Sequence, residues 1–205
     1  MHIPDGYLSL PVAVGSFIIS LTFVVAATRR VSLKQGLSVE RVSLMTALSA
    51  SIFVAQMIAW PIPGGTSLHL IGGALAGIIL GPWLGMLSMA LVLTVQCLVF
   101  HDGGITALGA NILNMGVVAV ITGYSLFRVL GGGKRPLIAG FVAGWLSLLL
   151  AGISCGVELS VSWSSILPVY VMGLWHAFLG IMEGVITGSI IAYLSVKASK
   201  LGRWS

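Results

Sequence analysis

Charged side chains are scarce in this chain: Asp, Glu, Lys and Arg together make up 7% of its 205 residues, whereas 58% are hydrophobic. These proportions lie far outside the range of soluble globular proteins and are typical of polytopic membrane proteins. The formal net charge of +5 does not indicate nucleic-acid binding, because the basic residues stand between apolar segments instead of forming one face. We therefore predict a multi-pass protein of the cell membrane that binds no nucleic acid.

Cysteine pairs and catalytic motifs are also missing. Cys97 and Cys155 fall inside apolar runs, where small thiols pack well, so we expect neither a disulfide nor a CxxC metal site. The glycine run that ends at Lys134 is followed by Arg135 and does not make a phosphate-binding loop, and no HExxH motif or nucleophile elbow occurs. These absences predict a protein that is neither an ATPase nor an enzyme and that needs no cofactor.

Seven apolar stretches are candidates for membrane helices. They run from about Leu10 to Thr28, Val42 to Trp60, Leu70 to Leu80, Trp83 to Phe100, Ile105 to Phe127, Pro136 to Val157 and Pro168 to Val196. Most reach the roughly 20 residues that a helix needs to cross a bilayer, but the third is too short and ends at a Gly-Pro pair. We predict an all-α, polytopic membrane helix bundle of about seven segments, one of them short or broken, in a single domain over residues 1–205.

Basic residues lie in three regions of the chain, which the positive-inside rule places in the cytoplasm. The regions contain Arg29, Arg30, Lys34 and Arg41; Arg128, Lys134 and Arg135; and Lys197, Lys200 and Arg203. Counting crossings from these regions puts the N-terminus outside, provided that the short segment also crosses. Six polar residues of chemical interest then gather on the external side, where we expect ligand to bind: His2, Asp5, His69, His101, Asp102 and Glu158.

The chain begins Met1-His2, and this dipeptide can chelate a metal ion. Its terminal amine, the His2 amide nitrogen and a His2 ring nitrogen can close fused five- and six-membered rings, which gives three nitrogens in one plane. A planar nitrogen set suits Ni(II), Cu(II) and, with more difficulty, Co(II), but neither zinc nor magnesium. The alternative is a terminus that stays disordered, although the turn-forming Pro4-Asp5-Gly6 sequence bends the chain just after it. We predict that residues 1–9 form a metal-chelating segment whose fourth ligand lies elsewhere.

Small residues recur every four positions in three apolar segments, a spacing that lets helix backbones approach closely in lipid. The rows are Ala47, Ser51, Ala55 and Ala59; Gly73, Gly77 and Gly81; and Gly180, Gly184 and Gly188. We expect the two glycine rows to pack the bundle, and the alanine and serine row either to pack or to dock a partner protein. His176 and Glu183 stand two turns apart on the last segment. A structural pair between helices is expected for them, with a proton or ion relay as the alternative.

Several separated motifs, in order along the chain, give it a family resemblance. They are Met1-His2-Ile3-Pro4-Asp5-Gly6, Pro61-Ile62-Pro63-Gly64-Gly65-Thr66-Ser67-Leu68-His69, Leu80-Gly81-Pro82-Trp83, Asp102-Gly103-Gly104 and Leu108-Gly109-Ala110-Asn111. With these motifs the chain resembles the CbiM/NikM family, the substrate-binding membrane subunits of cobalt and nickel energy-coupling-factor transporters. The likeness is densest up to Gly116 and continues more loosely to the C-terminus.

The resemblance implies a seven-helix subunit whose N-terminus folds inward and holds Ni(II) or Co(II) with Met1, His2 and His69. It also implies three kinds of partner: a transmembrane coupling subunit, cytoplasmic ATPase subunits and often a small auxiliary membrane subunit. Asp5 and Asn111 are candidates to orient the loop or a ligand imidazole. His101 departs from the small residue usual at its position, and it is either a bystander or an accessory ligand.

Two hypotheses from other functional classes are alternatives to a metal-transport subunit. A membrane assembly or scaffold protein would have an incidental N-terminal histidine, would bind no stoichiometric metal and would tolerate the loss of His2. A metal-dependent membrane enzyme would need an open coordination position for its substrate, whereas four protein nitrogens leave a plane closed.

Overall fold

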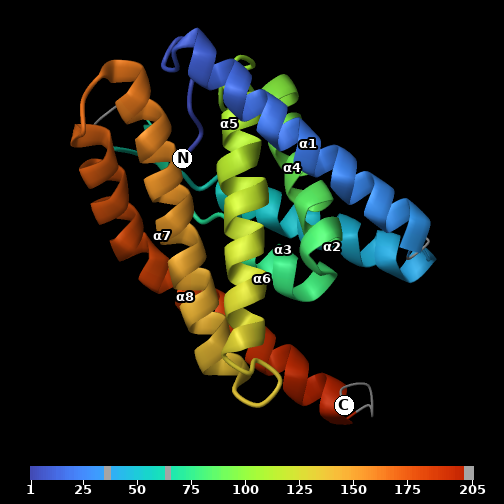
Figure 1. The fold of residues 1–205 in the computed structure, drawn as a ribbon. Helices are drawn as coiled ribbons and strands as arrows, with labels where there is room; N and C mark the ends of the chain where they lie inside the picture. The colour runs from blue at the N-terminus through green and yellow to red at the C-terminus, as the bar shows by residue number, and fades with distance from the viewer. Residues whose placement is uncertain (35–37, 63–65, 201–205) are drawn as a thin grey trace.

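The computed structural model describes residues 1–34, 38–62 and 66–200 and shows a bundle of helices (Figure 1). The helices are α1 (Leu10–Lys34), α2 (Val39–Gln56), α3 (Gly73–Leu80), α4 (Pro82–Phe100), α5 (Leu108–Asn111), α6 (Ala119–Val129), α7 (Pro136–Trp163) and α8 (Leu167–Lys200). A π-helical stretch, Ile112–Val118, joins α5 to α6, so residues 108–129 form one continuous helical segment. The predicted all-α fold with about seven helical segments is confirmed.

Five helical segments are long and apolar enough to cross a membrane. They are Leu10–Ser32, Pro82–Phe100, Leu108–Val129, Pro136–Trp163 and Leu167–Lys197. Within the described part of the chain, α2 and α3 are not among them. The eight residues of α3 rise only about 12 Å, and most of them are buried inside the bundle. The five long apolar segments make the protein a multi-pass membrane protein.

The segment between α2 and α3 differs from the prediction. Helix α2 ends at Gln56 instead of reaching Trp60, because Pro61 has no amide hydrogen and cannot continue a helix. A short antiparallel hairpin follows, made of β1 (Trp60–Ile62) and β2 (Thr66–Leu68), with Trp60 opposite Leu68. The predicted Pro63-Gly64-Gly65 motif and the tail residue Arg203 lie outside the described residues.

Five of the six glycines in the two rows pack the bundle, as expected, whereas Gly81 has open space around it. A Cβ atom on Gly77 of α3 would lie 2.8 Å from the Val120 carbonyl oxygen of α6. A Cβ on Gly184 of α8 would lie 2.6 Å from the Phe141 carbonyl oxygen of α7. These distances are too short for any side chain, so glycine lets α3 touch α6 and lets α7 run against α8.

Two acidic residues have partners that the sequence did not indicate. Glu158 lies inside α7, not in a loop, and accepts hydrogen bonds from Ser16 Oγ (2.9 Å) and Asn114 Nδ2 (2.6 Å). Glu183 accepts from the backbone amides of residues 71 (3.0 Å) and 72 (2.7 Å), and His176 Nδ1 lies 2.7 Å from the carbonyl oxygen of residue 172. The expected pairing of His176 with Glu183 is therefore wrong.

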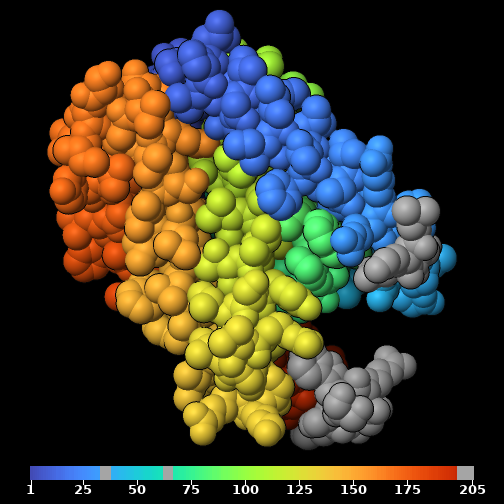
Figure 2. All heavy atoms as spheres, in the orientation of Figure 1, coloured from blue at the N-terminus to red at the C-terminus, as the bar shows by residue number. Residues whose placement is uncertain are grey.

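The two ends of the bundle differ. Figure 1 shows the first residues and the α7–α8 connection at the upper end, and the α6–α7 connection and the last turns of α8 at the lower end. Figure 2 shows α1, the segment of residues 108–129 and α7 side by side on one face. Two of the three basic regions thus lie toward one end and the N-terminal segment toward the other.

A candidate metal site at the buried N-terminus

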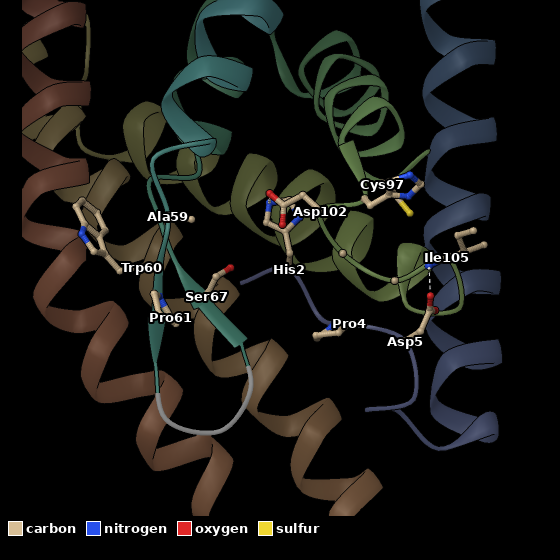
Figure 3. A pocket seen from close by; sticks show the side chains of 13 residues that line it. His2, Pro4, Asp5, Ala59, Trp60, Pro61, Ser67, Cys97, Asp102 and Ile105 are labelled. Carbon is tan, nitrogen blue, oxygen red and sulfur yellow. Dashed lines mark hydrogen bonds and ion pairs between the residues drawn. The ribbon is translucent and has the colours of Figure 1, made fainter. Parts of the chain in front are cut away.

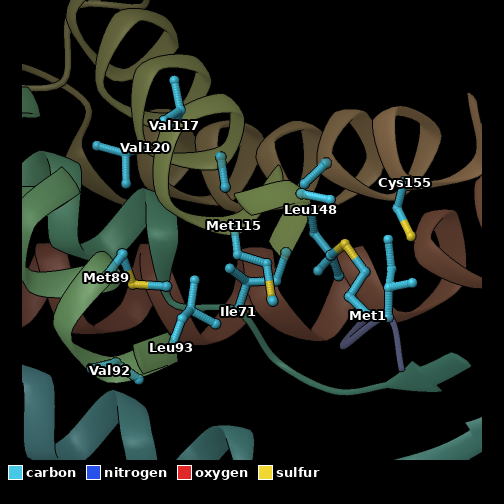
Figure 4. Packing of buried hydrophobic residues seen from close by; sticks show 14 of the residues in the cluster. Met1, Ile71, Met89, Val92, Leu93, Met115, Val117, Val120, Leu148 and Cys155 are labelled. Atoms are coloured by element: carbon cyan, nitrogen blue, oxygen red, sulfur yellow. The ribbon is translucent and has the colours of Figure 1, made fainter. Parts of the chain in front are cut away.

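The first three residues of the chain are inserted into the bundle. Met1 and Ile3 are fully buried, and His2 is only 4% exposed. The Met1 side chain packs near Leu148 and Cys155 of α7 (Figure 4). The terminal amine donates hydrogen bonds to the Ser67 carbonyl oxygen and, over 2.9 Å, to the Ser67 hydroxyl. The start of the chain is therefore held in place and does not lie free in solvent.

Asn111 fixes the backbone of this segment. The Ile3 amide donates to Asn111 Oδ1 over 2.9 Å, and Asn111 Nδ2 donates to the Ile3 carbonyl oxygen over 3.3 Å. The Gly104 amide donates to the same carbonyl oxygen over 2.9 Å. Of the two roles predicted for Asn111, orienting the loop is the one that its hydrogen bonds support.

Asp5 fastens the far end of the segment to the turn before α5. Its carboxylate accepts hydrogen bonds from the Thr106 amide (2.7 Å), the Thr106 hydroxyl (2.5 Å) and the Ile105 amide (3.2 Å). The hydrogen bonds from Thr106 lower the pKa of Asp5, so the carboxylate is charged at neutral pH. Gly104 packs directly against the backbone of Asp5, because a Cβ atom at this position would lie 2.3 Å from the Asp5 amide nitrogen. The hydrogen bonds that the carboxylate accepts support the loop-orienting role predicted for Asp5.

The rings of His2 and His69 lie next to each other, with their centroids 4.6 Å apart and a 32° angle between their planes. His69 is fully buried, and its Nδ1 lies 2.8 Å from the Leu70 carbonyl oxygen. Because a carbonyl oxygen can only accept, Nδ1 carries the ring proton and Nε2 presents a lone pair. That Nε2 atom has no hydrogen-bond partner among the described residues, which leaves it free to bind a metal ion.

Asp102 faces His2; the sequence placed it among the external polar residues but gave it no role in the site. Its Oδ2 lies 3.7 Å from His2 Nε2, and the two side chains point toward each other in Figure 3. This distance is longer than a hydrogen bond, and the buried imidazole is neutral, so the contact is not an ion pair. The signals available in the sequence were its predicted external position and its place in the Asp-Gly-Gly motif. The contact itself joins residues a hundred positions apart.

An open cavity of about 700 Å³ leads to His2. Asp5, Trp60, Ser67, His101 and Asp102 are among its lining residues (Figure 3). His101 adopts a left-handed backbone conformation just after α4 and is exposed. It belongs to the mouth of the cavity, and its described contacts do not include His2 or His69. The arrangement supports the bystander reading of His101.

Burial sets the protonation of the nitrogen donors. It lowers the pKa of the terminal amine from 8.0 to about 5 and that of His2 from 6.5 to about 3. The pKa of His69 also falls well below 6.5, first through burial and then through the nearby terminal amine. Burial raises the pKa of Asp102. At neutral pH the amine and both imidazoles are unprotonated, the state in which nitrogen binds metal.

A metal site with three or more protein ligands needs backbone donors among the described residues. Within residues 1–34, 38–62 and 66–200, no group of three or more His, Cys, Asp or Glu side chains is placed to hold a metal ion. The terminal amine, the His2 amide and the two imidazoles bring four nitrogens together. Nitrogen donors in that number suit Ni(II), Cu(II) or Co(II).

Comparison with known proteins identifies the class as membrane proteins of metal transport. The profile of the family described as the cobalt uptake substrate-specific transmembrane region, CbiM, matches residues 2–201. The chain belongs to this family, which confirms the resemblance seen in its motifs.

Individual relatives agree with this assignment. A putative fused nickel transport protein of Archaeoglobus fulgidus is 49% identical over 95% of this chain, which spans 65% of that relative. A putative metal transport protein of Haloquadratum walsbyi is 43% identical over 95% of this chain and 90% of the relative. The crystal structure of a transition metal transporter superposes with a TM-score of 0.92 at 31% identity, covering 97% of this chain and 94% of the other.

Proposed function

We propose that this chain captures Ni(II) or Co(II) from outside the cell and passes the ion inward, as the substrate-binding subunit of an energy-coupling-factor transporter. The observation that carries the proposal is the buried terminal amine beside two adjacent imidazoles, one with a free Nε2. The ligands are the amine of Met1, the amide and Nδ1 of His2, and Nε2 of His69. Family membership and the names of the relatives support metal transport in general.

Binding requires small changes from the described geometry. The amine exchanges its hydrogen bonds to Ser67 for the ion, and the His2 amide loses its proton. When Nδ1 of His2 binds the ion, Nε2 carries the ring proton and points to the Asp102 carboxylate, which fixes the ring. The two positive charges of the ion are then balanced by the ionised amide and by Asp102. Such neutralisation is what a buried ion requires.

Release of the ion needs energy from other proteins, because the chain has no phosphate-binding loop. We assign this energy to cytoplasmic ATPase subunits that act through a transmembrane coupling subunit, with a small auxiliary membrane subunit as a third partner. In this arrangement the N-terminal segment and the open cavity face outward, and the basic regions face the cytoplasm.

The pH dependence of binding tests whether the amine is docked. Its pKa of about 5 means that it holds no proton at pH 6 to 8, so binding releases only the amide proton. The logarithm of the association constant should fall by about one per pH unit from pH 8 to 6 and more steeply below about pH 5. Competition with a chelator of known affinity would measure this slope.

A solvent-exposed terminus predicts a different slope. Its amine would have an ordinary pKa near 8 and would be protonated over most of the same range. Two or more protons would then leave on binding, and the logarithm would fall by about two or more per unit between pH 7.5 and 6. That steeper slope would contradict the docked site.

The row of small residues on α2 is the proposed docking face for the coupling subunit. Ala47 and Ser51 are exposed, and Ala55 is half-buried at the edge of a cavity between α2, α3 and α8. Ala59 lies beyond the end of α2, at the mouth of the metal site. The helical docking face therefore consists of the first three residues only.

Replacing Ala55 by leucine should disrupt this docking face and leave metal binding intact. The longer side chain would hold a partner helix away, so the amount of coupling subunit that co-purifies should fall at least about five-fold. Val54→Leu is the matched control, because Val54 is 62% exposed on a neighbouring face of α2. Normal co-purification with Ala55→Leu would rule out docking through this row.

A further inference from the structure

His176 lies in the first third of the membrane-spanning part of α8, and its ring has a free lone pair. The residue is fully buried, nine positions or about 13 Å after the start of the helix. Its Nδ1 lies 2.7 Å from the Met172 carbonyl oxygen, so Nδ1 carries the proton. Its Nε2 has no hydrogen-bond partner in the described part of the chain. His69 has the same arrangement of one bonded and one free ring nitrogen.

The bundle makes room for this ring. A Cβ atom on Gly152 of α7 would lie 2.5 Å from His176 Cγ, so the imidazole rests directly on the α7 backbone. Phenylalanine could fill such a space without an unsatisfied nitrogen. A buried polar atom without a partner costs free energy, and an ionisable side chain at membrane depth is a candidate for function.

The chain after β2 brings His69 to the same part of α8. Strand β2 contacts α8, and the amides of Ile71 and Gly72 donate to Glu183, two turns after His176. Two turns rise about 10 Å, and two extended residues span at most about 7 Å. These spans allow His69, two positions before Ile71, to reach the turns that carry His176. In agreement, a positive charge on His176 would lower the pKa of His69.

We propose that His176 is a second ligand for the transported ion. After the ion dissociates from the N-terminal nitrogens, Nε2 of His69 and Nε2 of His176 bind it together. This inference rests on the proposed function. Neither imidazole gains or loses a proton in the transfer, because both keep the proton on Nδ1. The amide of His2 takes back from water the proton that it lost on binding.

His176 lies beside the proposed capture site, because Gly152, on which its ring rests, stands between Leu148 and Cys155, the residues of α7 near Met1. Further along α8, a cavity of about 130 Å³ is lined by Glu183 and Thr187 of α8 and by Ser51 of α2. The ion would thus pass from four nitrogens to two before it leaves.

The test uses the full chain, purified in detergent, with two residues added before Met1 to disable the capture site. Co(II) should still bind in a 1:1 ratio, at least about 1,000-fold more weakly than to the native chain, and X-ray absorption should show two imidazoles. Adding His176→Phe should abolish this residual binding, and adding His101→Phe should leave it unchanged. Circular dichroism and gel filtration check that each variant is folded.

Two outcomes would overturn the inference: no residual binding in the extended chain, or residual binding that survives His176→Phe. Measuring metal binding by the native chain in parallel distinguishes a failure of this inference from a failure of the proposed function. If the native chain binds no metal, the proposed function fails; if it binds and the extended variants do not behave as stated, only the role of His176 fails.

Discussion

Adding two residues before Met1 is expected to abolish tight binding of Ni(II) and Co(II). The extension turns the Met1 amine into a peptide nitrogen, and the fully buried Met1 leaves no space for further residues at that point. The Met1 amine and the His2 amide, two of the four donors, are lost together with the chelate ring that they close. Affinity for the metal ion should therefore fall at least about 1,000-fold. Chelator competition on the purified protein would measure the loss.

The length of the extension matters. A single added residue would place histidine third, and an amine, two amides and an imidazole would then form a planar nitrogen set of their own. Two added residues avoid this. An extension of the same length at the C-terminus is the control and should bind like the native chain. Equal affinity of the N-terminally extended and native chains would show that the terminal amine is not a ligand.

Replacing His69 by alanine should have the second largest effect. In the proposed site His69 contributes the fourth nitrogen, and its Nε2, which has no hydrogen-bond partner among the described residues, lies in the buried group beside His2. Alanine leaves three nitrogens and an open position that water fills, so affinity should fall at least about 100-fold. The Ni(II) absorption band of a closed nitrogen plane should disappear at the same time.

His101→Ala is the matched control for His69→Ala. Both substitutions remove an imidazole near the same cavity, but His101 is exposed at its mouth. Binding should stay within about two-fold of the native value when His101 is replaced. A larger loss with His101→Ala than with His69→Ala would reverse the roles assigned to the two histidines.

Hydropathy predicted the helical segments but not all their ends. The predicted segment ended before Glu158, because a carboxylate is polar. In the structure α7 continues past Glu158, whose carboxylate accepts hydrogen bonds from Ser16 and Asn114 inside the bundle. The hairpin of residues 60–68 was missed because its strands have three residues each, too few for a pattern. Such features depend on tertiary contacts that one sequence does not display.

The candidate site was predicted in part. The terminal dipeptide showed its chelating chemistry directly, and the family motif pointed to His69. The contact of Asp102 with His2 and the hydrogen bonds of Asn111 to Ile3 join residues about a hundred positions apart. Only the fold reveals them. His176 was recognised as unusual, but its free Nε2 became visible only once its neighbours were known.

Titration of the native, untagged chain with Ni(II) tests the central claim most directly. We expect one equivalent of Ni(II) to bind and to give the diamagnetic, square-planar spectrum of four nitrogen ligands. His2→Ala and His69→Ala should each remove that spectrum. No stoichiometric binding, or a spectrum that survives both substitutions, would contradict the account and would favour a membrane scaffold whose N-terminal histidine is incidental.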